Sequence, residues 1–270
     1  MARLAARLAL VLVLLSIAGP LRAAEATLVS LATPRGAVQA FILIKPKKPV
    51  AAVILFAGGH GALGLTSATK MGWGSGNFLV RTRERFAAHG LMVAVVDAPS
   101  DKSSGMNAEF RMSRDHASDI GAVVTHLKTL ANVPVWLVGT SMGTFSAAGA
   151  AVHKSGAHGL VLTSTVTRAK PDWKVAGSHA DGVASMALDR VTGPTMIVSH
   201  AEDGCAVTPA SDAPKLTRKL SAAKPVEVVI LDGGRPPQSD PCEARSQHGF
   251  LGIEGKAVDA IARYVKAHGS

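Results

Sequence analysis

Short apolar runs alternate with longer amphipathic segments along most of this chain. The run 50–57 is continuously apolar, as expected for a strand that is buried on both faces of a parallel sheet. Eight segments have the length and composition of strands: 26–31, 38–44, 50–57, 91–96, 134–138, 159–162, 195–199 and 226–231. Helical patterns cover 77–89, 112–130, 141–153, 181–188, 209–220 and 253–267. This alternation predicts an α/β fold, with a mostly parallel sheet covered by helices on both faces and with the first two strands antiparallel.

Two long segments show no regular period. Residues 58–76 are rich in glycine and directly follow a predicted strand, whereas residues 163–193 join two strands and contain only one short helical candidate. A long connection at the ligand edge of such a sheet is typical of a cap. Since 163–193 is too short for an elaborate lid domain, we expect a small cap or none.

The first 24 residues do not belong to this pattern. Two arginines within the first seven residues precede an apolar run at 8–18, and Gly19-Pro20 follows. These features predict a signal peptide that is cleaved near Ala23 or Ala24, which leaves 25–270 as a single domain in the periplasm or the medium. The alternative is a retained membrane anchor, but the apolar run is short of a full membrane span.

The charge balance is basic. The chain has 29 Lys and Arg against 19 Asp and Glu, which gives +10. Removal of residues 1–24 takes away three arginines and no acid, so 10 − 3 = +7 remains. The basic residues are scattered and aromatics make up only 4% of the chain, so nothing indicates a nucleic-acid partner. A basic surface would instead attract anionic substrates or an anionic envelope surface.

The chain contains two cysteines, Cys205 and Cys242. Export would place them in an oxidising compartment, where such a pair is typically bridged, and their separation rules out a C-x-x-C redox motif. No Cys or His spacing resembles a zinc site, and the ten histidines include no H-E-x-x-H pair. We therefore expect a disulfide and no metal.

The five residues Gly139-Thr140-Ser141-Met142-Gly143 lie between a predicted strand and a run of small residues. A buried strand, then G-x-S-x-G, then a helix is the context of a nucleophile elbow. The turn is sharp, so a side chain at Gly139 or Gly143 would crowd the neighbouring backbone, and the serine itself is strained. Such a turn would lift the Ser141 hydroxyl clear of the sheet.

A serine hydroxyl is a weak nucleophile that needs a base, and the base needs an orienting partner. Asp203 follows the strand 195–199, and His248 ends the long loop after the strand 226–231. Carboxyl ends of parallel strands are where working residues gather, and the order serine, acid, histidine is that of an α/β hydrolase. With G-T-S-M-G, A-E-D-G-C-A-V-T-P and Q-H-G-F, the chain resembles the α/β-hydrolase superfamily over residues 26–267.

The resemblance implies that Ser141 is the nucleophile, His248 the general base and acid, and Asp203 the residue that holds the imidazole. Three residues remain as alternatives: His200 for the base, and Glu202 and Asp97 for the acid. The chain is similar in size to dienelactone-hydrolase-like proteins, but that branch uses cysteine as nucleophile, so its substrate is not carried over. A bridge between the two cysteines would tie the acid loop to the histidine loop and stabilise the fold by about 3–4 kcal/mol.

An acyl-transfer intermediate needs two backbone N–H donors for its oxyanion. We expect one from Met142 and the other from His60 or Gly59, in the loop after the third strand. The same loop matches G-x-G-x-x-G over 59–64, a pattern that binds dinucleotides where a helix begins at once. Residues 65–76 contain four Ser or Thr and three Gly and make a poor helix, so no cofactor is expected.

The sequence thus predicts an exported serine hydrolase that cleaves an ester or a related acyl bond of a small molecule through an acyl-enzyme. Three alternatives use the same fold: a peptidase or amidase, an acyltransferase, and a hydrolase-fold binding protein without activity. The intact serine, acid and histidine argue against the last. The sequence indicates neither the acyl and alcohol groups nor an oligomeric state.

Overall fold

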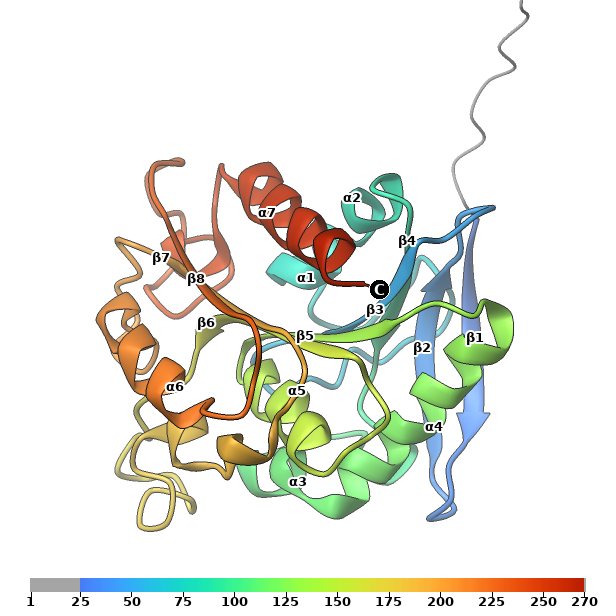
Figure 1. Cartoon of the computed structure of the whole chain (residues 1–270), viewed down its shortest axis with the longest axis horizontal. Helices are drawn as coiled ribbons and strands as arrows, with labels where there is room; N and C mark the ends of the chain where they lie inside the picture. The colour runs from blue at the N-terminus through green and yellow to red at the C-terminus, as the bar shows by residue number, and fades with distance from the viewer. Residues whose placement is uncertain (1–24, 270) are drawn as a thin grey trace, which may run out of the picture.

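The computed structural model describes residues 25–269, so the expected signal peptide lies outside the described residues. Eight strands form one twisted sheet (Figure 1). In chain order the strands are β1 (Ala26–Ala32), β2 (Val38–Ile44), β3 (Ala51–Phe56), β4 (Leu91–Val96), β5 (Val135–Ser141), β6 (Gly159–Thr165), β7 (Thr195–His200) and β8 (Val226–Leu231). All eight predicted strands are therefore confirmed.

The strands lie in the order β1-β2-β4-β3-β5-β6-β7-β8. β2 pairs antiparallel with both β1 and β4, and every other pair is parallel. β3 and β4 are buried along their whole length, as their apolar runs predicted, whereas the edge strand β8 is partly exposed. β5, which carries Ser141, lies in the middle of the sheet.

Helices cover both faces of the sheet (Figure 1). One face carries α1 (Phe78–Arg81), α2 (Arg83–Ala88) and α7 (Glu254–Ala267). The opposite face carries α3 (Ala108–Met112), α4 (Arg114–Leu130), α5 (Gly143–Val152) and α6 (Ala213–Lys219). A separate apolar core fills each interface between helices and sheet. The α/β architecture predicted from the sequence is confirmed.

Several predicted helix boundaries are wrong, and local hydrogen bonds explain two of them. The expected helix 77–89 is divided at Thr82, whose hydroxyl donates to the carbonyl of Phe78 and so competes with the helical backbone. The expected helix 112–130 begins at Arg114 because the Ser113 hydroxyl caps it by accepting from His116 N–H. The unpredicted helix α3 lies just before it and is capped by Asn107.

Three further predicted helices also need correction. The helix expected at 141–153 begins at Gly143, because Ser141 has a left-handed backbone conformation. The helix expected at 209–220 contracts to α6, preceded by a single 3₁₀ turn. The candidate 181–188 is not an α-helix but forms short 3₁₀ turns. The connection between β6 and β7 is thus largely irregular, and it packs its apolar side chains, such as Val175 and Val183, into the core beneath it.

Candidate active site

Ser141 lies at the sharp turn between β5 and α5. Its φ of 52° lies in the left-handed region, which serine rarely adopts, so the backbone is strained there. A Cβ on Gly139 would collide with the backbone of Gly143, and a Cβ on Gly143 would collide with the carbonyl oxygen of Phe56. The prediction that both glycines are needed for close packing is confirmed.

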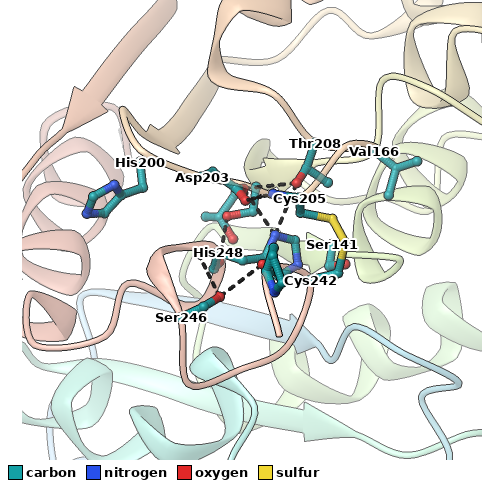
Figure 2. A network of polar contacts seen from close by, with 12 residues as sticks. Ser141, Val166, His200, Asp203, Cys205, Thr208, Cys242, Ser246 and His248 are labelled. Carbon is teal, nitrogen blue, oxygen red and sulfur yellow. Dashed lines mark hydrogen bonds and ion pairs between the residues drawn. A yellow bond between two sulfur atoms is a disulfide. The ribbon is translucent and has the colours of Figure 1, made fainter. Parts of the chain in front are cut away.

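Asp203 lies in the loop that follows β7 (Figure 2), and its side chain is completely buried. The Oδ1 atom accepts a hydrogen bond from the backbone N–H of Cys205 at 3.0 Å. The Oδ2 atom accepts from the Thr208 hydroxyl at 2.9 Å and lies 3.0 Å from Nδ1 of His248. These three donors replace the water that a buried carboxylate loses, so the charge is tolerated in this position.

His248 belongs to a 3₁₀ turn, Gln247–Gly249, and is only 4% exposed. Its Nδ1 faces both Oδ2 of Asp203 and, at 3.1 Å, the Thr208 hydroxyl. A carboxylate can only accept, so the proton of a neutral ring belongs on Nδ1, and Nε2 becomes the basic nitrogen. Within residues 25–269, this buried Nε2 has no hydrogen-bond partner.

Two serines fix the turn that carries His248. The Ser164 hydroxyl donates to the carbonyl oxygen of His248 at 2.8 Å, and the Ser246 hydroxyl accepts from its backbone N–H at 3.2 Å. Both serines are buried. Backbone contacts on either side of the residue therefore restrict where the imidazole can point.

Ser141 and His248 line the same cavity, which has a volume of about 250 Å³. Gly58, Gly59 and Trp73 also line it. The structure records no hydrogen bond between the Ser141 hydroxyl and the His248 ring among the residues it describes. Hydrogen bonds of this kind are commonly long in the absence of substrate and shorten when it binds.

A second cavity of about 240 Å³ lies beside the first, and its exposed wall is apolar. Met142, the residue after Ser141, lines it together with Ala108 at the start of α3. Trp173 and Val175, from the irregular connection between β6 and β7, close its other side. The nucleophile elbow is therefore flanked by two small cavities of different character.

The three amides expected to bind an oxyanion come from two loops that face each other. Gly59 lines the cavity of Ser141, whereas His60 packs its ring against Trp73 at 4.0 Å between ring centroids. The backbone N–H groups of Gly59, His60 and Met142 have no acceptor within the described part of the chain. They are available to an incoming oxygen atom, so Gly59 and His60 both remain candidates in their loop.

Asp97, one alternative for the acid, has a different position. Its carboxylate accepts from the backbone N–H groups of Leu63, Leu65 and Ala98 at 2.6–2.8 Å. It therefore anchors the glycine-rich loop after β3 rather than a histidine. Between Gly64 and Phe78, within the described chain, no helix forms, so the G-x-G-x-x-G segment lacks the helix N-terminus that a dinucleotide site requires.

His200 and Glu202 also lie apart from the pair formed by Asp203 and His248. Nε2 of His200 is 2.8 Å from the carbonyl oxygen of Gly233, and its Nδ1 accepts from the backbone N–H of Glu202. Both ring nitrogens are thus occupied by backbone groups, and Figure 2 shows the ring on the far side of Asp203. The Glu202 side chain is exposed. Neither residue forms a hydrogen bond with His248.

Cys205 and Cys242 form a disulfide, with their Cα atoms 4.6 Å apart. The bridge joins the loop that carries Asp203 to the loop that leads to His248, as expected (Figure 2). Cys242 also lines the cavity of Ser141. The disulfide is therefore part of the site's wall.

Residues 25–269 contain no group of three or more His, Cys, Asp or Glu side chains arranged to hold a metal ion. Over the same residues, no helix is long and apolar enough to cross a membrane.

Sequence reasoning missed Thr208, which contacts both Asp203 and His248. A signal was present, because Thr208 is five residues after the acid in the same short loop. It also missed Arg111 and Ser164, whose contacts come from distant parts of the chain and leave no recognisable pattern in the sequence. Ser246, two residues before His248, was missed as well.

Solved structures with the same fold share little sequence with this chain. An esterase of Pyrococcus furiosus superimposes with a TM-score of 0.67 at 12% identity, over 92% of each chain. A dienelactone hydrolase of Anabaena variabilis gives 0.60 at 14% identity, over 92% of this chain and 100% of the other. A puromycin-hydrolyzing peptidase of Mycobacterium tuberculosis gives 0.65 at 12% identity, over 94% of this chain and 40% of that longer chain. No curated protein matches the sequence.

A family model provides the evidence at the level of sequence. The model described as "Serine aminopeptidase, S33" matches residues 71–227, a range that contains Ser141 and Asp203 and ends before His248. The eight-stranded sheet and the structural neighbours agree with it. The chain therefore belongs to the serine aminopeptidase S33 family and has the α/β-hydrolase fold.

Proposed function

We propose that this protein is a serine esterase that cleaves small or medium-sized esters through an acyl-enzyme on Ser141. One observation carries the proposal. Nδ1 of His248 is held by the buried Asp203 at 3.0 Å, while its unpartnered Nε2 and the strained Ser141 belong to one cavity. This is the arrangement that acyl transfer by a serine needs.

In this proposal His248 removes the proton from the Ser141 hydroxyl as the serine oxygen attacks the ester carbonyl. Asp203 stabilises the imidazolium that forms and keeps its Nδ1–H in place. The backbone N–H of Met142 and that of Gly59 or His60 bind the oxyanion. His248 then protonates the leaving alcohol, and water, activated by the same base, releases the acid.

The volumes of the two cavities beside the elbow favour small substrates. Volumes of about 250 and 240 Å³ are below the range usual for sites that hold drug-sized ligands. We assign the acyl group to the apolar cavity next to Met142 and the alcohol to the cavity lined by Trp73 and His248. An ester whose acyl part is a short hydrocarbon chain fits this division.

A peptidase activity is the second candidate, and the family match favours it. The matching family is described as a serine aminopeptidase, and one structural neighbour is a peptidase that hydrolyses puromycin. The same serine, histidine and acid can cleave an amide, so only substrates distinguish the two activities.

The first experiment is labelling with a fluorophosphonate probe, followed by peptide mapping. We expect one adduct, on Ser141, and none in the Ser141→Ala variant. Failure of the wild-type protein to react would exclude a serine hydrolase and leave the inactive binding protein. A panel of p-nitrophenyl esters of graded length, together with aminoacyl p-nitroanilides, then separates the esterase from the peptidase.

We also propose that the protein is exported, with cleavage near Ala23 or Ala24. The argument rests on the sequence of residues 1–24, and the disulfide between Cys205 and Cys242 is compatible with it because such bonds persist in oxidising compartments. N-terminal sequencing of the protein from cell-envelope and medium fractions tests this. A protein that retains residues 1–24 in the membrane fraction would contradict it.

A further inference from the structure

Arg111 lies on α3 and is only 1% exposed. Within residues 25–269 the structure pairs it with no carboxylate. Burial lowers its pKa to about 10, so the guanidinium still carries its charge at neutral pH. A buried charge without a counterion is costly and uncommon. Its position therefore requires an explanation beyond packing.

The guanidinium donates three hydrogen bonds, each to a different part of the fold. Nε donates to the carbonyl oxygen of Met106 at 3.2 Å, and Nη1 donates to the Ser146 hydroxyl at 3.0 Å. Nη2 donates to the carbonyl oxygen of Gly59 at 3.1 Å. Ser146 lies on α5, the helix that begins after Ser141, and Gly59 lies on the loop that faces it. Arg111 thus connects the two segments that supply the oxyanion amides.

Glycines make room for this connection. A Cβ on Gly61 would collide with the guanidinium of Arg111, and one on Gly149 would lie 2.6 Å from its backbone carbonyl oxygen. Gly61 has a φ of +72°, so two independent reasons exclude a side chain there. The loop after β3 and helix α5 are both shaped around Arg111.

The hydrogen bond from Arg111 to the carbonyl oxygen of Gly59 acts on the peptide group that joins Gly59 to His60. In a trans peptide the C=O and N–H point in opposite directions. A carbonyl fixed by a cation is therefore held away from the cavity side, and the N–H of the same peptide becomes a stronger donor. The N–H groups of both Gly59 and His60 have no acceptor in the described chain, so this loop is ready to donate.

We propose that Arg111 is a positioning residue for the oxyanion hole. It holds the Gly59–His60 peptide through a charge-assisted hydrogen bond and places a positive charge behind the amides that face the developing oxyanion. This inference rests on the proposed hydrolase function. Preorganised dipoles and charges of this kind act mainly on the transition state and little on the bound substrate.

The test compares Arg111→Met and Arg111→Lys with Arg218→Met, a matched control at an exposed arginine on α6. Three quantities are measured: kcat and KM for p-nitrophenyl butyrate, and the inhibition constant of phenylboronic acid. The boronate forms a tetrahedral anion on the serine and so imitates the intermediate. Melting curves verify that each variant is folded.

For Arg111→Met we expect kcat to fall about 30- to 100-fold, with KM within about threefold of the wild-type value. The expected fall in kcat is somewhat smaller than the fall caused by removing an oxyanion donor itself. The inhibition constant of phenylboronic acid should rise by a similar factor. Arg111→Lys keeps the charge but not the three-way contact, so about a 5- to 10-fold fall is expected. Arg218→Met should match the wild type.

Two results would overturn the proposal. One is a folded Arg111→Met variant with unchanged kcat; the other is a fall in kcat without any weakening of boronate binding. If Arg111→Met does not fold, Arg111→Lys provides the test. Wild-type values of kcat and of the boronate inhibition constant in Arg111→Lys would refute the positioning role of Arg111. The proposed function is tested separately, because a wild-type protein that is not labelled on Ser141 fails before any Arg111 variant is compared.

Discussion

Nδ1 of His248 lies 3.0 Å from Oδ2 of Asp203, although the two residues are 45 positions apart in the chain. Glu202, the neighbour of Asp203, is exposed, and within residues 25–269 its carboxylate forms no hydrogen bond or ion pair with a histidine. The side chains of two adjacent acids thus point into different environments. We predict that Asp203→Asn lowers kcat by about 10³- to 10⁴-fold, because the carboxamide no longer favours the productive tautomer.

Glu202→Gln is the matched control for Asp203→Asn and should leave kcat within about twofold, since surface substitutions away from a site have small effects. Steady-state hydrolysis of a p-nitrophenyl ester by both variants is the measurement. Equal and mild losses in the two variants would refute the assignment of Asp203.

The Thr208 hydroxyl donates to Asp203 at 2.9 Å and lies 3.1 Å from Nδ1 of His248. Thr208→Val preserves the shape but removes a donor from a buried carboxylate. Loss of one such bond costs about 1–2 kcal/mol, so kcat should fall about 5- to 30-fold with little change in KM. Thr208→Ser should restore most of the activity, and Thr125→Val, at an exposed threonine on α4, should behave as the wild type. A Thr208→Val enzyme with normal kcat would show that Asp203 needs no third donor.

The nucleophile elbow, the order of serine, acid and histidine along the chain, and the disulfide could all be predicted from the sequence. Each of them depends on a local pattern or on chain order. Gly139 and Gly143 signal a sharp turn by their positions alone. Arg111 could not be predicted in this way. Its burial depends on the packing of α3 against α5 and on the room left by Gly61 and Gly149, which are tertiary features.

The helix boundaries failed for a related reason. Thr82 and Ser113 are compatible with a helical pattern, but their hydroxyl groups bond to nearby backbone groups and end or begin a helix there. A hydrophobic period reports which face of a segment is buried and carries no information about such competing bonds. The site residues were less sensitive to this error because they lie outside the α-helices.

Reduction of the disulfide should affect both stability and activity. The bridge spans 37 residues, and a loop of this size contributes about 3–4 kcal/mol. For a domain of this length that corresponds to a fall in melting temperature of about 10 °C. Because Cys205 donates its N–H to Asp203, the loosened loop should also lower kcat.

The double variant Cys205→Ala/Cys242→Ala should reproduce the effects of a phosphine reductant, and the reductant should then have no further effect on it. Melting curves and ester hydrolysis are recorded with and without reductant. Unchanged activity and melting temperature after verified reduction would refute the hypothesis that the disulfide holds Asp203 against His248.

Substitutions at the apolar cavity should alter the preferred acyl length. Ala108→Phe fills the space beside Met142 and should shift the preference toward acetyl esters, whereas Trp173→Ala enlarges the same space and should favour longer chains. The ratio of kcat/KM between butanoate and acetate esters is the measurement, and an extra methylene in such a pocket is worth about 1–3 kcal/mol. If neither variant changes the ratio, the acyl group occupies the cavity of Trp73 instead.

His116 provides a prediction about pH. Its ring is fully buried on α4, and neither ring nitrogen has a hydrogen-bond partner in residues 25–269. Burial, together with the charges of Arg111 and Arg35, lowers its pKa to about 3. The unfolded chain therefore binds a proton below about pH 6.5 that the folded protein does not.

Stability supplied by neutral His116 is thus fully present above pH 6.5 and is lost as the pH falls toward 3. Between pH 7.5 and 5.5 this one group should cost the wild type about 1.4 kcal/mol of unfolding free energy. His116→Leu lacks the proton-binding ring, so its unfolding free energy should decrease by that much less over the same interval. Urea unfolding at both pH values measures the difference, and parallel losses in wild type and His116→Leu would mean that His116 is protonated in the folded protein.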